Sequence, residues 1–533
     1  MLVRQGVWFA VSILIQALFA SSGHAQYDVI IRGARMLDGA GNPWRYADVA
    51  INGEAVAAVG DLSAATAERV VDAGGLYLAP GFIDVHTHDG PGLATAELSH
   101  ARPLLAQGIT TVFINPDGGG PVDLAAQQAS LLEHGLGVNV AQLVPHGSVR
   151  SAVIGMDDRA PTAGELDEMR ELVRRGMEAG AFGLSSGLYY APGSYAETEE
   201  VIALAQVVGE FGGVYQSHIR DEADYNIGLV AAVDEVIRIA SEARIKGIVT
   251  HIKALGPRVW GYSQALVQRI DRARAAGIEV YADQYPYAAS GTSITGALVP
   301  RWAQVGGNAA LIARLDSGGT LARLKADVLE NLDRRGGAAR LQFQIYEADR
   351  SIEGRTLQEV ADERGLEPVD LVVELLHEGD ASLVSFNMLE DDIATLMRQP
   401  WTMTSSDGSI TQLGLGMPHP RWYGTFPRKI RKYVIDDRVI DLESAIRSMT
   451  SLSAGVMGLP EHGLIRPGAA ADIVVFDLER LRDLATFADP HHYSEGMVYV
   501  VVNGKLAIDG GEFTDVMSGK VLLKGSGASS AMP

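Results

Sequence analysis

Residues 81–90 read Gly-Phe-Ile-Asp-Val-His-Thr-His-Asp-Gly, a short apolar run that ends in His86 and His88. Side chains two residues apart on a strand leave the same face, so both imidazoles can point at one spot. Imidazole is a common ligand of zinc and similar ions, and a catalytic metal site also keeps one position open for water. The stretch therefore predicts a metal site at the end of a buried strand.

Seven further apolar runs with strand character follow the first one at 82–85. They span residues 110–114, 138–144, 182–185, 214–217, 247–250, 279–282 and 402–405. Apolar residues recur at helical spacing in segments between these runs, at 97–107, 124–133, 164–179, 198–211, 229–243 and 263–275. Eight buried strands that alternate with helices indicate an α/β fold with a parallel sheet, most simply a (β/α)8 TIM-type barrel.

The two ends of the chain predict a second, smaller domain. Apolar and polar residues alternate at 27–35, 47–51 and 55–59, and again at 472–477, 498–503 and 505–508. We expect residues 26–80 and 455–524 to form one β-sandwich beside a barrel at 81–454. The gap before the eighth barrel run is too long for a single helix, so residues 291–395 are expected to form a helical insert after strand 7.

The N-terminus predicts export. A basic start, the apolar run 7–20 and small residues after it predict a signal peptide at 1–25, cleaved after Ala25. An uncleaved anchor would use the same residues, although the apolar run is short for a membrane span. We therefore expect a secreted protein of the bacterial periplasm, without membrane contact after cleavage. Small residues at 525–533 predict a disordered tail.

Composition narrows the classes of ligand and partner. Hydrophobic residues make up 47% of the 533 residues and charged residues 21%, as in a soluble globular protein. The formal net charge of −22 disfavours binding to nucleic acid or anionic lipid. There is no cysteine, so metal ligands must be His, Asp, Glu or a modified Lys. The sequence indicates no oligomeric state.

Polar residues suited to chemistry follow most of the predicted barrel strands, at the end where active sites of such barrels lie. In strand order they are His86 and His88, Asp117, His146, His218, His251, Tyr285 and Asp407. This agreement between position and chemistry predicts one site at one mouth of the barrel. Taken alone, Asp407 in Ser-Ser-Asp-Gly would be read as a turn or helix-capping residue.

Several longer motifs extend this pattern. They are Gly81-Phe-Ile-Asp-Val-His-Thr-His88, Gly183-Leu-Ser-Ser-Gly-Leu188, Ser217-His-Ile-Arg-Asp-Glu222, His251-Ile-Lys-Ala254, Tyr285-Pro-Tyr287, Ser406-Asp-Gly408 and His419-Pro-Arg-Trp-Tyr-Gly-Thr-Phe-Pro427. Together they resemble the N-acyl-D-amino-acid deacylases, or D-aminoacylases, of the amidohydrolase superfamily. The resemblance implies a metal-dependent hydrolase that cleaves the amide bond of small N-acyl-D-amino acids. It also implies one or two divalent ions per chain, zinc first, with manganese or cobalt as alternatives.

The resemblance also implies roles for individual residues. The metal ligands would be His86, His88, Asp117, His218, His251 and Asp407, with Asp407 also acting as general base and then general acid. Lys253, Tyr285 and Arg421 would bind the α-carboxylate of the substrate, a group that a planar guanidinium matches well. His146 would either polarise the substrate carbonyl or brace the third strand.

One position departs from the family, which usually has a metal-bridging cysteine after the motif Gly-Ile-Thr-Thr at 108–111. Counting from that motif places Asp117 there. A carboxylate can bridge two cations through its two oxygens, although Asp also suits a Gly-rich turn. Lys253 as a carbamylated bridge is a further alternative. Arg220, Asp221 and Glu222 could support the site or form a salt-bridged loop.

Two other functions stay open on the sequence. One is a dipeptidase or cyclic-amide hydrolase on the same scaffold. The other belongs to a different class, a catalytically silent secreted binding protein that lost efficient metal binding together with the cysteine. Substrate side-chain and acyl preferences lie in loops and in the insert, where sequence patterns carry little information.

Overall fold

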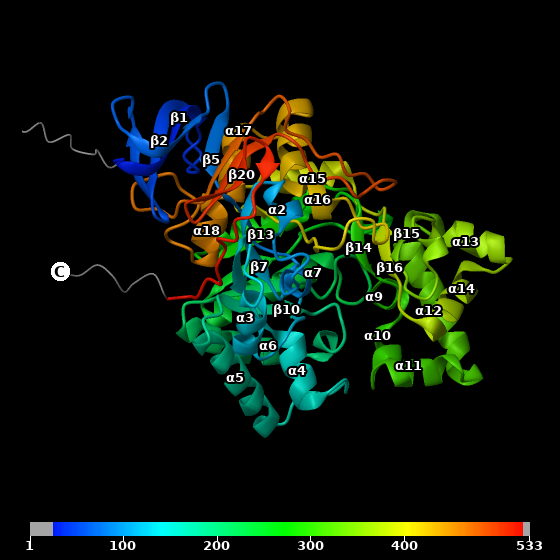
Figure 1. Cartoon of the computed structure of the whole chain (residues 1–533). Helices are drawn as coiled ribbons and strands as arrows, with labels where there is room; N and C mark the ends of the chain where they lie inside the picture. The colour runs from blue at the N-terminus through cyan, green and yellow to red at the C-terminus, as the bar shows by residue number, and fades with distance from the viewer. Residues whose placement is uncertain (1–24, 526–533) are drawn as a thin grey trace, which may run out of the picture.

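A computed structural model describes residues 25–525, which form a mixed α/β fold in three parts (Figure 1). A set of parallel strands and helices lies in the centre, a sheet built from both chain ends lies beside it, and an insert lies on the other side. The predicted signal peptide up to residue 24 and the predicted tail after 525 lie outside the described residues. Within residues 25–525, no helix has the length and apolar character that a membrane crossing requires.

Nine central strands fill eight consecutive positions in the order of the sequence. Hydrogen bonds join them in parallel as β6-β7-β8 and as β9-β10-β11-β12-β13-β17. Their bounds are Phe82–Asp84, Ile109–Ile114, Asn139–Gln142, Val144–Pro145, Gly183–Gly187, Val214–His218, Lys246–Val249, Val280–Gln284 and Thr402–Thr404. The predicted strand at 138–144 is thus two short strands, β8 and β9, interrupted at Leu143.

The two outer strands of this set are linked just beyond their ends. Asp407 N donates to His86 O at 3.0 Å, and His88 N donates to Gly408 O at 2.7 Å. These bonds bring the segment after β17 against the segment after β6. The first and the eighth predicted strands therefore deliver their polar residues to the same place.

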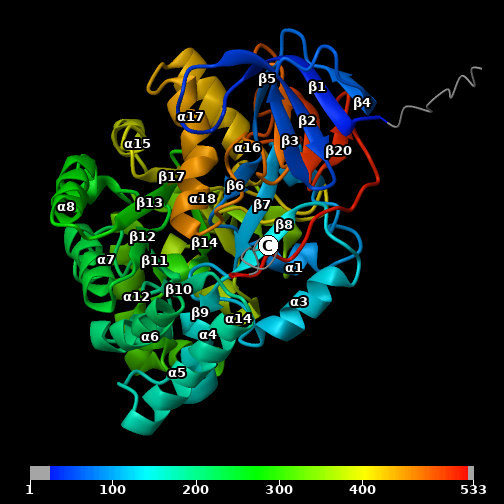
Figure 2. The ribbon, with the colours of Figure 1, turned by 90° about the vertical axis from the view of Figure 1, so that its left-hand side faces the viewer.

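Helices cover the outer side of the central strands (Figure 2). Besides α1 (Gly90–Leu93) and α4 (His146–Ile154), five helices between successive strands are α3 (Leu124–Leu132), α5 (Ala163–Glu178), α6 (Thr198–Glu210), α7 (Leu229–Ala243) and α8 (Ser263–Ala275). All five overlap the predicted helices, and α5 begins at a capping box formed by Thr162 and Glu165. The predicted helix at 97–107 is wrong in extent: only α2 (Arg102–Leu105) forms, with Pro103 in its first turn, because proline suits the start of a helix and disrupts its interior.

The two chain ends share one nine-stranded sheet. The path is β21-β20-β19-β18-β5-β1-β2-β3, with β4 parallel to β1, and β5 pairs antiparallel with β18. In chain order the strands are β1 (Tyr27–Met36), β2 (Arg45–Asn52), β3 (Ala55–Gly60), β4 (Ala67–Asp72), β5 (Tyr77–Pro80), β18 (Ile473–Phe476), β19 (Met497–Val502), β20 (Lys505–Asp509) and β21 (Glu512–Phe513). Hydrogen bonds join them in one continuous order, so the two-layer sandwich stays a prediction.

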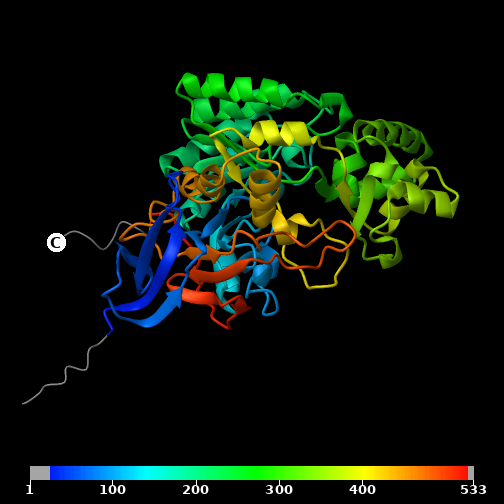
Figure 3. The same ribbon diagram turned by 90° about the horizontal axis from the view of Figure 1, so that it is seen from above.

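The insert contains a sheet that the sequence analysis missed. Strands β14 (Ser290–Ser293), β16 (Ser382–Ser385) and β15 (Leu341–Ile345) pair antiparallel. The helices around them are α9 (Ile294–Leu298), α10 (Arg301–Gln304), α11 (Asn308–Leu315), α12 (Gly318–Arg334), α13 (Leu357–Arg364) and α14 (Pro368–Glu378). The insert has its own hydrophobic core and projects to one side of the molecule (Figure 3). The sequence analysis expects a helical insert, and helices α9 to α14 form there, but the sheet was not anticipated because β14, Ser-Gly-Thr-Ser, has no apolar alternation.

The rest of the chain leads from the insert back to the small sheet. After β16 come α15 (Glu390–Met397) and β17, followed by α16 (Arg421–Arg428), the π-helical segment η5 (Lys429–Asp436), α17 (Leu442–Met449) and α18 (Ser451–Met457). The chain then enters β18. Helix α18 begins before residue 455, where the sequence analysis starts the second half of the small domain.

A buried polar network fastens the small sheet to the central strands. Asn139 of β8 donates to Asp472 Oδ2 at 2.9 Å, and Asn503 N donates to Asp472 Oδ1 at 2.7 Å. Asn503 Nδ2 also donates to Asn139 Oδ1 at 2.7 Å. All three side chains are buried, so each relies on the others for its hydrogen bonds.

Replacing Asp472 with alanine is expected to lower the free energy of unfolding by about 3 kcal/mol, because it leaves buried amide groups without acceptors. Urea unfolding followed by circular dichroism measures this loss. The matched control is Asp509→Ala in the same sheet, where the exposed Arg69–Asp509 pair at 2.9 Å should contribute about 0.5 kcal/mol or less. Equal losses in both variants would contradict the role given to the network.

Candidate metal centre

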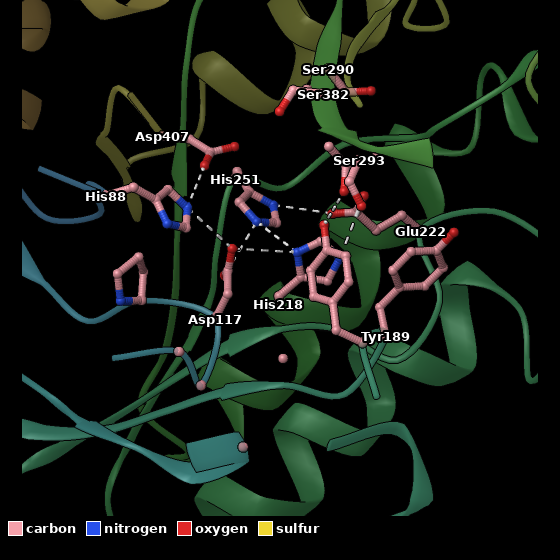
Figure 4. Close-up of a pocket in the computed structure, with 18 of the residues that line it drawn as sticks. His88, Asp117, Tyr189, His218, Glu222, His251, Ser290, Ser293, Ser382 and Asp407 are labelled. Carbon is pink, nitrogen blue, oxygen red and sulfur yellow. Dashed lines mark hydrogen bonds and ion pairs between the residues drawn. The ribbon is translucent and has the colours of Figure 1, made fainter. Parts of the chain in front are cut away.

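Four polar side chains from the segments after β6, β7 and β17 meet at one place, and Figure 4 shows three of them, His88, Asp117 and Asp407. His86 Nε2 lies 3.4 Å from Asp117 Oδ1 and 3.6 Å from Asp407 Oδ1. His88 Nε2 lies 3.5 Å from Asp117 Oδ2 and 3.2 Å from Asp407 Oδ1. One ligand atom from each residue lies within 4.8 Å of the others, a spacing that suits a single metal ion.

A second group shares Asp117 with the first. His218 Nδ1 and His251 Nε2 lie 3.0 Å apart, at 3.8 Å from Asp117 Oδ2 and 3.6 Å from Asp117 Oδ1 respectively. Figure 4 shows Asp117 between His88 on one side and the pair His218 and His251 on the other. The two carboxylate oxygens therefore face both groups, as a bridging ligand requires.

The backbone at three of these residues is in the left-handed region. The φ angles are +53° at Asp117, +35° at His251 and +47° at Asp407. Such conformations are unfavourable for residues with a Cβ and gather at functional sites, where the surrounding structure enforces them. After Asp117, a Cβ at Gly118 would lie 2.9 Å from Gly147 N, so only glycine allows this turn to pack so closely.

The charges of the histidines and aspartates in these two groups depend on one another. Burial alone would lower the pKa of His86, but the nearby Asp117 and Asp407 carboxylates raise it well above its usual value. Burial would likewise raise the pKa of Asp117, yet His86, His218 and His251 hold it well below its usual range. Asp117 is therefore an anion surrounded by imidazoles.

The donor set fits a divalent metal. Among residues 25–525, His86 Nε2 and Asp117 Oδ1 are buried atoms without a hydrogen-bond partner. Unpaired buried polar atoms are costly, and a cation between these two atoms would satisfy both. Four imidazoles and two carboxylates are also the ligand types expected for zinc or a similar ion.

Two buried carboxylates hold the ligand loops in place. Asp84 Oδ1 accepts from Ser406 N at 3.0 Å and from His86 N at 3.2 Å. Asp283 Oδ1 accepts from His251 N at 2.8 Å and from Ser405 Oγ at 2.6 Å. These bonds position the backbone on which His86, His251 and Asp407 are mounted.

A cavity of about 650 Å³ opens beside the metal ligands. Lys253, Tyr285 and Arg421 line it, as the sequence analysis expects of substrate-binding residues. Arg421 Nη1 lies 2.8 Å from Asp407 Oδ2, and its guanidinium lies 4.7 Å from the centre of the Tyr285 ring. Asp407 thus contacts both the metal ligands and the cation next to them.

Lys253 lies on the outer side of His251. Its Nζ donates to Glu222 Oε1 at 2.6 Å and lies 2.6 Å from His251 Nδ1, while the opposite ring nitrogen of His251 faces Asp117. This placement disfavours Lys253 as a carbamylated bridge. It favours a position in the cavity wall, with Glu222 as the partner that orients both Lys253 and His251.

The neighbours of Glu222 have different roles. Arg220 forms a bidentate pair with Glu235 at 2.8 Å, and Asp221 accepts from the backbone of Ala223, Asn226 and Gly228. These two residues therefore stabilise the loop after β11. Of the three residues considered together from the sequence, only Glu222 contacts the metal ligands and lines the cavity.

The structure does not bring His146 to the cavity wall. Its side chain is fully buried, and Nε2 lies 2.9 Å from Glu200 Oε1. Glu200 also pairs with Arg150. Of the two roles left open by the sequence, these contacts favour support of the strand end over polarisation of a substrate carbonyl.

Several cavity residues escaped the sequence analysis. Tyr189 stacks on His218 with ring centres 5.5 Å apart, and Tyr190 contacts the same imidazole in a tilted arrangement with ring centres 4.6 Å apart. Their position just after β10 follows the strand-end pattern, which could have identified them. Arg335 and the serines of β14 also line the cavity, but they come from the insert, and no motif marked them.

Comparison with known proteins agrees with this geometry. The model of the amidohydrolase family matches residues 69–508. The chain is 35% identical over 500 residues to N-acyl-D-glutamate deacylase of Alcaligenes xylosoxydans xylosoxydans, covering 90% of this chain and 93% of that protein.

Solved structures agree over nearly the same length. The structure of N-acyl-D-glutamate deacylase from Bordetella bronchiseptica, complexed with zinc and a phosphonate inhibitor that mimics the tetrahedral intermediate, has a TM-score of 0.78 at 33% identity, covering 93% of this chain and 99% of that one. A D-aminoacylase with a binuclear metal centre has a TM-score of 0.80 at 32% identity, covering 93% and 100%. The ligand pattern, the fold and these matches coincide, and the chain belongs to the amidohydrolase family.

Proposed function

We propose that the protein hydrolyses the amide bond of N-acyl-D-amino acids and releases a carboxylic acid and a free D-amino acid. The observation that carries this proposal is the position of Asp407, 3.2 Å from His88 Nε2 and 2.8 Å from Arg421 Nη1. A carboxylate that would be able to transfer a proton therefore lies between the proposed metal ligands and a cation that matches the α-carboxylate of the substrate. The D configuration rests on the names of the similar proteins.

The metal would be held by His86, His88, Asp117, His218 and His251, with Asp407 at the edge of the first group. A divalent ion bound there supplies a Lewis acid that polarises the amide carbonyl and lowers the pKa of water toward neutrality. We propose zinc, at one or two ions per chain, because similar structures contain zinc and a binuclear centre. Manganese and cobalt suit the same ligands, because carboxylate in place of the family's cysteine removes the softest donor.

Asp407 would take the proton from the attacking water and return it to the leaving nitrogen, since an amide nitrogen must be protonated before it departs. Its carboxyl group has a pKa well below its usual range: burial would raise it, but Arg421, His251, His86 and His88 lower it. Asp407 is therefore ionised at neutral pH and able to accept a proton. Arg421 would hold the substrate so that the amide lies beside it.

We extend the proposal to the setting of the site. The eight central strand positions would close into a (β/α)8 barrel, linked where Asp407 N meets His86 O. The two chain ends would form the small domain, with boundaries as predicted from the sequence. The N-terminal pattern of basic, apolar and small residues supports export to the periplasm.

The alternatives make different demands on the same cavity. A cyclic amide lacks the free α-carboxylate that Arg421 and Lys253 would bind, which favours an open-chain substrate. A dipeptidase would share that carboxylate, and a silent binding protein would show no chelator-sensitive turnover. A panel of acetyl-D-amino acids, acetyl-L-amino acids and dipeptides, assayed with zinc, manganese and cobalt, separates these functions. Equal hydrolysis of the L substrates would remove the stereochemical part of the proposal.

Asp117→Asn is expected to reduce bound metal by about half or more in a two-metal site, because a neutral amide is a poor bridge between cations. Asparagine tolerates the left-handed backbone at this position, so the fold should persist. Elemental analysis of the dialysed protein measures metal per chain, and turnover should fall with it. Normal metal content would favour the alternative in which Asp117 only shapes the turn.

Asp407→Asn is expected to lower kcat by a factor of about 100 to 10,000, the usual contribution of general acid–base catalysis. Metal content should stay close to that of the wild type, because the four histidines and Asp117 remain. Steady-state kinetics on an acetyl-D-amino acid, together with elemental analysis, tests both statements. Retained turnover would show that another group transfers the proton.

Gly291→Ala is expected to raise KM by about tenfold through overpacking. A Cβ there would lie 3.0 Å from Gln344 Nε2 and 3.3 Å from Arg421 Nη2, so it would displace the guanidinium. The matched control is Gly455→Ala in α18, where a Cβ meets nothing within 4 Å. An unchanged KM in Gly291→Ala would show that β14 does not position Arg421.

A further inference from the structure

Arg335 is a buried cation in the cavity wall without an anionic partner. It directly follows α12 in the insert, lines the cavity and is 2% exposed. Its Nε donates to Ala297 O at 3.2 Å, Nη1 donates to Ser385 Oγ at 3.1 Å, and Nη2 donates to the Tyr189 hydroxyl at 3.4 Å. All three acceptors are neutral, and the described part of the chain provides no ion pair to this guanidinium.

The other buried arginines behave differently. Within residues 25–525, Arg150 and Arg421 are also buried, and each pairs with a carboxylate, Glu200 and Asp407 respectively. A buried charge is expensive unless an opposite charge compensates it. Arg335 also uses three of the five N–H groups of a guanidinium, which leaves two for a ligand. Arg335 therefore has the charge and the spare donors that an anion in the cavity would need.

The insert places this site near the proposed α-carboxylate position. Ser385, which accepts from Arg335, pairs with Ser290 in the β14–β16 ladder. The next residue of β14 is Gly291, whose Cβ position lies 3.3 Å from Arg421 Nη2. Two neighbouring residues of β14 thus connect the arginines: Ser290 pairs with the partner of Arg335, and Gly291 lies close to Arg421.

A single side chain, that of Tyr189, lies between Arg335 and the proposed metal ligand His218. The Tyr189 ring stacks on His218 with centres 5.5 Å apart, and its hydroxyl accepts from Arg335. A ligand that spans Arg421 and Arg335 would therefore stay beside the metal centre. Such a ligand needs two carboxylates separated by a short chain.

We propose that Arg335 binds a second carboxylate of the substrate, carried by the amino-acid side chain, so that the preferred substrates are N-acyl derivatives of acidic D-amino acids. This inference rests on the proposed deacylase function. The α-carboxylate and the side chain are attached to the same carbon atom, so the two carboxylates would be placed to reach Arg421 of α16 and Arg335 of the insert. The amide carbonyl would face the metal ligands, and the acyl chain would extend from this carbonyl, on the other side of the amide bond from the amino-acid side chain.

The charge of the substrate can be tested without changing the protein. N-acetyl-D-glutamate and N-acetyl-D-glutamine have nearly the same shape and differ in one charge. We expect kcat/KM of the metal-loaded enzyme to be about 10 to 100 times higher for the glutamate compound, as expected for hydrogen bonds to a charged group. Equal values for the two compounds would overturn the inference and leave the deacylase function intact.

Substitution of Arg335 tests whether this residue causes the preference for the charged substrate. Arg335→Met should lower kcat/KM for N-acetyl-D-glutamate by about 10 to 100 times while that for N-acetyl-D-glutamine changes little, which also shows that the variant is folded. The matched control is Arg334→Met, because Arg334 is already paired with Glu330 at 2.6 Å and lines a different cavity. If Arg335→Met does not fold, Arg335→Lys should keep a weaker preference for the charged substrate. An unchanged preference in a folded Arg335→Met protein would overturn the assignment.

A carboxylate on the acyl group of the substrate is the alternative ligand for Arg335. N-succinyl-D-valine and N-butyryl-D-valine separate it, because the charge then lies on the acyl side. Preference for the succinyl compound, without preference for N-acetyl-D-glutamate, would overturn the side-chain assignment. Failure to hydrolyse any of the four compounds would instead count against the deacylase function itself.

Discussion

The structure depends on one carboxylate held among four imidazoles. Asp117 lies within 3.4 to 3.8 Å of nitrogen atoms of His86, His88, His218 and His251, four residues delivered by three different strand ends. Such a cluster is unfavourable without compensation, because it buries donors and charges in a small space. The positive φ angles at Asp117, His251 and Asp407 show a backbone held in this arrangement by its surroundings. A divalent cation is the component that makes the arrangement favourable.

The cluster could be predicted because its residues follow a simple spatial rule. Parallel strands place their carboxyl ends at one edge, so His86, His218, His251 and Asp407 could be assigned to one site from strand order alone. Apolar periodicity, which is strong in these segments, predicted the central strands and five outer helices. It failed at residues 97–107, where Pro103 limits the helix to one turn. The strand-end rule also left the role of His146 undecided, because this residue follows a strand yet turns toward Glu200.

The insert could not be predicted in the same way. Its strand β14 is polar and short, and it forms only because β16, nearly a hundred residues later, supplies its partner. Arg335 is equally invisible in the sequence, because its unusual property is the absence of a carboxylate around it, and that depends on tertiary packing. The ends of the central strands therefore carry the proposed chemistry, while the insert carries Arg335, to which we assign the substrate preference. The candidate metal ligands could be recognised in the sequence, whereas Arg335, the proposed specificity residue, could be recognised only in the fold.

X-ray absorption at the zinc edge of the zinc-loaded protein tests the central claim most directly. The account predicts nitrogen and oxygen ligands at about 2.0 to 2.2 Å, with the outer-shell scattering of several imidazole rings. It predicts no sulfur ligand, since the chain contains no cysteine. Zinc that lacks imidazole scattering, or zinc lost on dialysis, would contradict a metal centre built around Asp117.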